Sequence, residues 1–117
     1  MENPQLAIGF LASHNGTDAQ AIVGQIEAGK LNARAGTLIS NNSREGAALF
    51  AKDPIHNMNF HHVSSITHEN PDAAMAEILL QEGVELVICS GFMKPIGPIL
   101  LATYPNNIWN PHPADTR

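Results

Sequence analysis

The sequence predicts an α/β fold built on a mostly parallel open sheet with helices on both faces. Short apolar stretches of strand length alternate with stretches whose apolar residues recur at helical spacing, along the whole chain of 117 residues. The connections are short and carry no hairpin turn signals. Consecutive strands are therefore expected to be joined through helices and to run parallel.

The amino-terminal part predicts a strand followed by a helix. Residues 6–11 (LAIGFL) form a continuous apolar run, which is typical of a strand buried on both faces. Thr17 and Gln20 then have the spacing of a capping box, and the apolar residues that follow recur at helical spacing. Gly29 is expected to end this helix, because glycine readily adopts the left-handed conformation found at helix ends.

The middle of the chain predicts two strands around a short helix. Residues 35–40 (AGTLIS) form the second expected strand, and the polar residues 41–43 form a turn. A helix is expected over 44–52 and ends at Asp53-Pro54, because the residue before a proline disfavours helical geometry. Residues 60–63 form the third expected strand.

The carboxyl-terminal part predicts two helices and two strands. The segment 70–72 (NPD) has the features of a helix start, with Asn as the cap, Pro in the first turn and an acid near the positive end of the helix dipole. Residues 84–89 (VELVIC) form an apolar strand. Residues 98–104 are expected to be helical, and residues 108–109 form a short last strand.

Length and composition predict a single cytosolic domain over residues 1–117. Hydrophobic residues make up 44% of the chain and charged residues 15%, which allows a packed core. Eleven acidic residues against six basic ones give a formal charge of −5, which argues against a nucleic-acid or anionic-membrane surface. The single cysteine excludes an internal disulfide, and the acidic start followed by a short apolar run is unlike a secretion signal.

Three loops are candidates for one functional site. In a parallel open sheet, ligands bind beyond the carboxyl ends of the strands. The loops 12–17, 90–95 and 110–113 each follow an expected strand and carry polar residues or glycine. We therefore expect these loops to converge at one edge of the sheet.

The loop before the first helix has the features of an anion site. Helix N-termini present free N–H groups and a positive dipole, which favour anions. Gly16 allows close approach to the backbone, and Thr17 adds a hydroxyl group. An ordinary capped turn between a strand and a helix is the alternative interpretation.

Asn110 and His112 are the candidate catalytic residues. The amide of Asn110 can hydrogen-bond a carbonyl oxygen, and His112 can carry a proton near neutral pH. The prolines on both sides of His112 stiffen the backbone of this loop. The alternative is a polar loop whose histidine faces solvent.

Other chemically active side chains receive structural interpretations. His61 and His62 are adjacent in an expected strand, so their side chains point to opposite faces and cannot share a metal ion. Cys89 is expected to be an inert thiol in the core. Met93 and Trp109 are candidates for lining a pocket for a flat ligand, although core packing is at least as good an interpretation for Trp109.

Four segments together resemble the folate-dependent formyltransferases. They are residues 11–17, the turn 40–42 (SNN), the stretch 90–94 (SGFMK) and the loop 110–113 (NPHP). The resemblance extends over roughly residues 6–114, and within the family it is greatest to the members that formylate glycinamide ribonucleotide in purine synthesis. It implies a Rossmann-like fold and transfer of a formyl group from 10-formyltetrahydrofolate to a primary amine, with small-molecule substrates and no metal.

The resemblance also assigns roles to residues. Asn110 would hydrogen-bond the formyl oxygen and stabilise the oxyanion, and His112 would polarise that oxygen and help to move protons. The substrate phosphate would be held by Asn15, Gly16, Thr17 and Asp18. The folate would be bordered by Phe92, Met93, Lys94 and Ile96.

The chain departs from the family pattern in three respects. Family members continue beyond the position of Arg117 and supply a catalytic Asp there, so we expect the chain to be an amino-terminal part that is inactive alone. Asp18 stands where the family usually has Asn, and His14 where Gly is common. Residues 114–117 (ADTR) replace the more usual Ser-Leu-Leu-Pro.

These departures leave two alternative functions and one expectation about assembly. The same groups could pass the formyl unit to water, as a formyltetrahydrofolate hydrolase does, because an acid at position 18 disfavours a phosphate. A non-catalytic protein that only binds an anion or folate is the second alternative. A sheet that ends after its fifth strand exposes an unpaired edge, so we also expect a homodimer, domain swapping or poor solubility.

Overall fold

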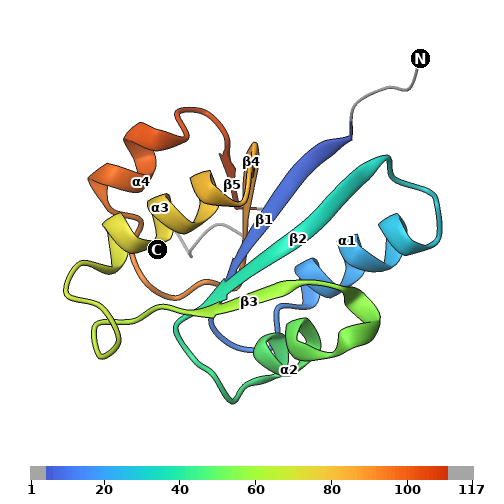
Figure 1. Cartoon of the computed structure of the whole chain (residues 1–117), viewed down its shortest axis with the longest axis horizontal. Coiled ribbons are helices and arrows are strands. Elements are labelled where there is room, and N and C mark those ends of the chain that lie inside the picture. Colours follow the sequence, from blue (N-terminus) through green and yellow to red (C-terminus); the bar gives the residue numbers. More distant parts are fainter. Residues whose placement is uncertain (1–4, 111–117) are drawn as a thin grey trace, which may run out of the picture.

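Five parallel strands form one sheet in the computed structural model, which describes residues 5–110 (Figure 1). The strands are β1 (Leu6–Ala12), β2 (Ala33–Ser40), β3 (Asn59–His62), β4 (Leu86–Ser90) and β5 (Ile108–Trp109). The helices are α1 (Thr17–Glu27), α2 (Gly46–Lys52), α3 (Pro71–Gln81) and α4 (Pro98–Thr103), with a short 3₁₀ turn, η1, at Pro54–His56. The α/β fold predicted from the sequence is confirmed, and every strand pair is parallel.

The strand order is β3-β2-β1-β4-β5. The chain builds outward from β1 through β2 to β3, and then returns to add β4 on the other side of β1. The direction of winding therefore changes between β1 and β4. In open parallel sheets, the crevice beyond the carboxyl ends of the strands at such a change is where ligands bind.

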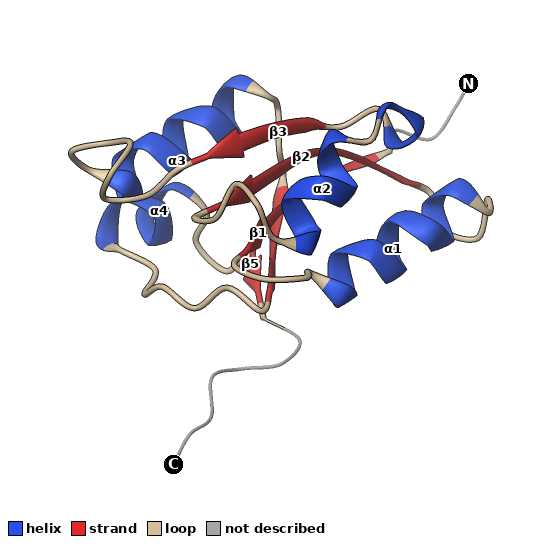
Figure 2. Ribbon diagram, turned by 90° about the horizontal axis from the view of Figure 1, so that it is seen from below, coloured by secondary structure: helices blue, strands red, loops and turns tan. Residues whose placement is uncertain are grey.

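Helices cover both faces of the sheet, α1 and α2 on one side and α3 and α4 on the other (Figure 2). Successive side chains of a strand point to opposite faces, so β1 contributes to both cores. Phe10 packs with residues of α1 and α2, whereas Leu11 packs with residues of α3 and α4. This two-sided burial explains why β1 is apolar without interruption.

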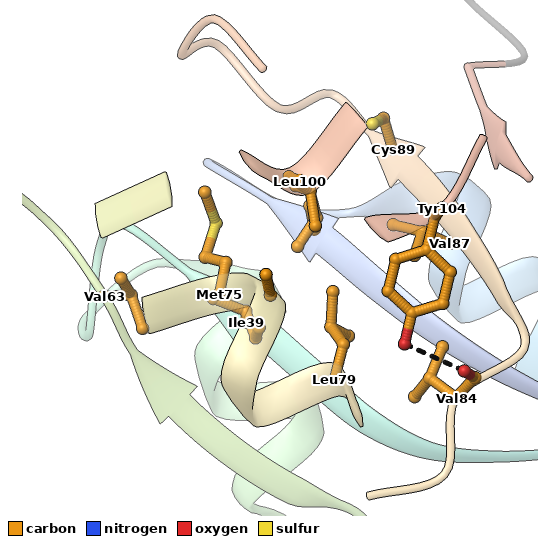
Figure 3. Packing of buried hydrophobic residues seen from close by; sticks show 11 residues of the cluster. Ile39, Val63, Met75, Leu79, Val84, Val87, Cys89, Leu100 and Tyr104 are labelled. Carbon is orange, nitrogen blue, oxygen red and sulfur yellow. Dashed lines mark hydrogen bonds between the residues drawn. The ribbon is translucent and has the colours of Figure 1, made fainter. Parts of the chain in front are cut away.

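Tyr104 is buried in the core beneath α3 and α4 (Figure 3). The hydroxyl of this buried tyrosine donates a hydrogen bond to the carbonyl oxygen of Val84 at 2.8 Å. Cys89 lies in the same core with 4% of its surface exposed, and burial raises the pKa of its thiol to about 11. The predicted position of Cys89 in the core is confirmed, and its burial disfavours the reactive thiolate.

Most predicted element boundaries agree with the structure to within about two residues, the usual uncertainty of helix and strand ends. The cap of α3 is confirmed, because the side-chain oxygen of Asn70 accepts a hydrogen bond from the N–H of Ala73. The predicted capping box at the first helix is wrong. Gly16 is the N-cap of α1 and has no side chain, and Gln20 donates its side-chain N–H to the carbonyl oxygen of Asn15 instead.

Core packing, one of the two interpretations of Trp109, is also wrong, because 53% of its surface is exposed. Its strand β5 has two residues and pairs with β4 at the edge of the described sheet. One unpredicted element is η1, where Asp53 accepts a hydrogen bond from the N–H of Ile55 instead of merely ending α2. No helix within residues 5–110 is long and apolar enough to cross a membrane.

Candidate functional site

A cavity of about 260 Å³ lies where the loops after β1 and β4 meet. Its lining consists of His14, Asn15, Gly16, Thr17, Asp18, Ser90, Gly91 and Met93. The structure thus brings together two of the three loops that the sequence singled out, at the change of winding between β1 and β4. All four residues predicted to hold the substrate phosphate line this cavity.

Gly16 shapes the wall formed by the start of α1. Its φ of 63° lies in the left-handed region, which glycine adopts without strain. A Cβ atom at this position would also come within 3.0 Å of the Cβ of Ala47 in α2. The backbone can therefore turn directly from β1 into α1 at this wall of the cavity.

Two buried serines connect the loops on either side of this cavity. The N–H of Met93 donates to the hydroxyl oxygen of Ser13 at 2.7 Å. The N–H of Ala19, in the first turn of α1, donates to the hydroxyl oxygen of Ser90 at 3.0 Å. The walls of the cavity are thus joined by two hydrogen bonds that run in opposite directions.

The charges around the small cavity are mixed. His14 is exposed and lies 3.6 Å from a carboxylate oxygen of Glu45, just before α2. Asp18 is half-buried in the first turn of α1, where the helix dipole stabilises a carboxylate. The described lining contains neither Lys nor Arg, so a bound phosphate would depend on the helix N-terminus, on hydroxyl groups and on His14.

The loop 91–97 separates the small cavity from a second one of about 490 Å³. Phe92 and Lys94 line the larger cavity together with residues of α3 and of the loop after β3, whereas Met93 lines the smaller one. Ile96 packs against the core beneath α3 and α4. Residues 92–94 therefore face two adjoining spaces.

A buried polar atom borders the larger cavity. The side-chain oxygen of Asn41 is inaccessible to solvent and has no hydrogen-bond partner within the described part of the chain. A buried carbonyl oxygen without a donor is energetically unfavourable. A ligand or water with an N–H or O–H group in the larger cavity would satisfy it.

The predicted catalytic residues stand at the carboxyl end of β5. Asn110 is exposed, is the last described residue and directly follows Trp109, which pairs with Ile88 of β4. The strand register thus places Asn110 at the carboxyl ends of the strands, the same end of the sheet that carries the two cavities. His112 lies outside the described residues.

The side chains of His61 and His62 do not share a partner. Their side chains take separate partners, as predicted for adjacent strand residues: His61 bonds to Glu82 at 2.7 Å, and His62 to the carbonyl oxygen of Asn41 at 3.3 Å. Within residues 5–110, no three or more His, Cys, Asp or Glu side chains gather in a way that could hold a metal ion. A third cavity of about 710 Å³ lies at the opposite edge of the sheet, near the start of β2 and β3.

Sequence reasoning missed three residues that shape the site. Ser13 and Ser90 stand inside the loops that were singled out, but their partners are 80 and 71 residues away. The sequence predicts a role for Asp72 only at the start of its own helix, whereas its carboxylate oxygens accept hydrogen bonds from the N–H groups of Ile99 and Leu100 at the start of α4. Only the position of Ser13 and Ser90 directly at strand ends could have drawn attention to them.

Comparison with known proteins identifies the family. A family model described as formyl transferase matches residues 6–114, which is nearly the whole chain. The chain belongs to the formyl transferase family. No curated protein sequence matches it.

Solved structures of formyl transferases share the fold. Glycinamide ribonucleotide transformylase 1 from Symbiobacterium toebii is 29% identical, with a TM-score of 0.84 over 93% of this chain and 54% of that one. Phosphoribosylglycinamide formyltransferase from Bacillus halodurans is 25% identical, with a TM-score of 0.81 over 92% of this chain and 58% of that one. This chain therefore spans little more than half the length of either structure.

A protein named for a different reaction has the same fold. Formyltetrahydrofolate deformylase from Pseudomonas syringae pv. tomato is 16% identical, with a TM-score of 0.76 over 92% of this chain and 35% of that one. At this identity the similarity concerns the fold alone. Proteins named for different reactions therefore share this fold.

Proposed function

We propose that the chain contributes to transfer of a formyl group from 10-formyltetrahydrofolate to a primary amine, with glycinamide ribonucleotide as the acceptor and purine synthesis as the context. The observation that carries this proposal is the meeting of the loops after β1 and β4 around one cavity, within a chain that matches the formyl transferase family over residues 6–114. The solved transformylase structures that are 25% and 29% identical support this acceptor.

The substrates would occupy the two adjoining cavities. The phosphate of the amine substrate would bind in the small cavity, at Asn15, Gly16, Thr17 and Asp18. The folate would lie along the loop 91–97, bordered by Phe92, Met93, Lys94 and Ile96. The larger cavity beside Phe92 and Lys94 offers room for part of this ligand, and the positive charge of Lys94 suits an anionic group on it.

The reaction would proceed through a tetrahedral intermediate. The amine nitrogen attacks the formyl carbon, and the amide of Asn110 donates to the oxygen that becomes negative. The bond between the formyl carbon and N10 of the folate then breaks. The proton lost by the amine moves by way of His112 to N10, which leaves tetrahydrofolate and the formylated amine.

The test is an assay with 10-formyltetrahydrofolate, with and without glycinamide ribonucleotide, of the chain alone and of the chain joined to the carboxyl-terminal part of a solved transformylase. We expect the chain alone to be inactive, and the joined protein to give formylated product together with tetrahydrofolate only when the amine is present. His112→Ala is expected to lower the rate by roughly 10²–10⁴-fold, and Asn110→Ala by roughly 10²–10³-fold. His56→Gln is the matched control, because this histidine borders the cavity at the opposite edge of the sheet.

A hydrolase is the second candidate, favoured by Asp18. The carboxylate of Asp18 in the lining of the small cavity repels a phosphate, whereas a hydrolase needs no phosphate site. Formate released without any amine, at the rate of folate turnover, would support the hydrolase and contradict the transferase. Binding of folate without turnover by the joined protein would instead support a purely binding role.

A further inference from the structure

Ser13 and Ser90 are among the most deeply buried polar residues of the described chain, with 2% and 1% of their surface exposed. Neither belongs to the residues proposed above to contact a substrate. Ser13 follows β1 and accepts the N–H of Met93, in the loop after β4. Ser90 ends β4 and accepts the N–H of Ala19, in the helix after β1. The segment after β1 therefore binds the loop after β4 through Ser13, and the end of β4 binds the helix after β1 through Ser90.

The bond to Ser90 replaces a normal helix cap. An N-cap side chain ordinarily accepts a hydrogen bond from the second or third N–H of its helix. The N-cap of α1 is Gly16, which has no side chain, and Ala19 supplies the third N–H of the helix. Because Ser90 accepts that N–H, the first turn of α1 is positioned by β4 as well as by its own loop.

The bond to Ser13 has the same effect on the other wall. Met93 lines the small cavity with an exposed side chain, so packing alone holds its backbone weakly. The bond of 2.7 Å from its N–H to the buried hydroxyl of Ser13 fixes this backbone against the end of β1. Ala12 of β1 and Ser90 of β4 lie directly opposite each other in the sheet. Both hydrogen bonds therefore connect the two segments at the same height along the strands.

We propose that Ser13 and Ser90 are positioning residues that hold the first turn of α1 and the loop 91–97 together as one unit. The two walls of the small cavity then keep a constant separation, and loosening one wall loosens the other. The expected effect on substrate binding rests on the proposed function, because the proposed function assigns the phosphate to the wall formed by α1 and the folate to the wall formed by the loop 91–97. The mechanical coupling itself concerns only the two loops.

Ser40 provides a matched control. It ends β2, is fully buried, and its hydroxyl oxygen accepts the N–H of Asn42 at 3.0 Å. This bond has the same chemistry and nearly the same length as the bond of Ser90, but it stays within one turn. Ser40→Ala therefore removes a buried serine bond at the same sheet edge without separating the two loops.

The decisive experiment is amide hydrogen exchange, measured by NMR on the free chain. Ser13→Ala should speed exchange at Met93, which loses its partner, and also at Ala19. Ser90→Ala should speed exchange at Ala19, which loses its partner, and also at Met93. We expect a change of about fivefold or more at the distant amide, as loss of one ordinary hydrogen bond would give. Ser40→Ala should affect Asn42 and leave Ala19 and Met93 unchanged.

Purely local effects would overturn the proposal. If each alanine variant speeds exchange only at the amide that lost its partner, the two bonds are independent caps. Should an alanine variant fail to fold, Ser13→Cys and Ser90→Cys under reducing conditions keep the side-chain volume and a weaker acceptor. They should give the same crossed pattern with smaller changes, and absence of that pattern would again contradict the proposal.

A binding measurement separates this proposal from the proposed function. Inorganic phosphate and 5-formyltetrahydrofolate are titrated as probes of the two walls. Ser13→Ala and Ser90→Ala should each weaken both probes, and unchanged affinities would contradict a positioning role. If the unaltered chain binds neither probe, the proposed function fails, whereas the crossed exchange pattern still decides whether the loops form one unit.

Discussion

Glu82 gathers three hydrogen-bond donors at the end of α3. Its carboxylate accepts from Thr37 of β2 and from Asn59 and His61 of β3. Burial raises the pKa of Glu82, but the hydrogen bonds from Thr37, His61 and Asn59 outweigh burial and leave the pKa below its usual value of 4.5. One ionised side chain thus fastens α3 to two strands.

This arrangement predicts a pH-dependent loss of stability. Because the folded pKa of Glu82 is lowered, its contribution is complete above pH 4.5 and is lost as the pH falls through the folded value. Glu82→Gln should lower the free energy of unfolding at pH 7 by roughly 1–2 kcal/mol. The difference from the unaltered chain should shrink toward pH 3.

Urea unfolding at pH 7 and pH 3 checks this expectation. Glu77→Gln is the control, because Glu77 lies on the same helix with an exposed side chain. The free energy of unfolding of Glu77→Gln should equal that of the unaltered chain at both pH values. A deficit of Glu82→Gln that is as large at pH 3 as at pH 7 would show that the charge of Glu82 is not what stabilises the fold.

Asp72 joins two helices that lie side by side on one face of the sheet (Figure 1). It belongs to the first turn of α3, yet its two carboxylate oxygens accept the N–H groups of Ile99 at 2.8 Å and Leu100 at 2.9 Å. Gly97 makes this approach possible, since a Cβ atom there would come within 2.4 Å of the carboxylate. The far end of the loop 91–97 is therefore fastened to α3.

Removal of this shared cap should destabilise α4. Asp72→Ala is expected to lower the free energy of unfolding by roughly 1–2 kcal/mol, the upper range for a helix cap. Amide exchange at Ile99 and Leu100 should speed up in the same variant. Asp53→Ala is the comparison, because it removes only one exposed hydrogen bond, at η1.

Chemical denaturation of both variants provides the measurement. We expect the loss in Asp72→Ala to exceed the loss in Asp53→Ala. Equal losses, with unchanged exchange at Ile99 and Leu100, would mean that α4 is held by its packing and not by Asp72.

The sheet of the described residues has β5 at one edge (Figure 1). This strand has two residues, and Trp109 exposes 53% of its surface. Exposed strand edges with apolar side chains favour pairing with another chain. We therefore propose that two copies associate through β5.

Light scattering over a range of concentrations tests this association. The unaltered chain should show a mass that rises toward that of a dimer, and Trp109→Lys should shift it toward the monomer, because a charge opposes edge pairing. Leu49→Lys is the control, since Leu49 is an exposed apolar residue on α2. A monomer at all concentrations would contradict the proposal.

Local sequence patterns were sufficient to predict the element types, their order and the loops that carry polar residues. Apolar runs, helical spacing and the cap at Asn70 are local features, because they depend on neighbouring residues only. The resemblance of four separated segments to the formyltransferases added the family, which the match over residues 6–114 confirmed. Roles for Asn110, His112 and the cavity residues remain predictions.

The contacts that hold the predicted loops together became visible only in the folded structure. The placement of β4 beside β1 brings Ser90 to α1 and Met93 to Ser13, across 71 and 80 residues of chain. Exposure of Trp109 likewise follows from the place of β5 at the sheet edge. These features depend on strand order and on packing between distant segments, and local sequence patterns carry no information about either.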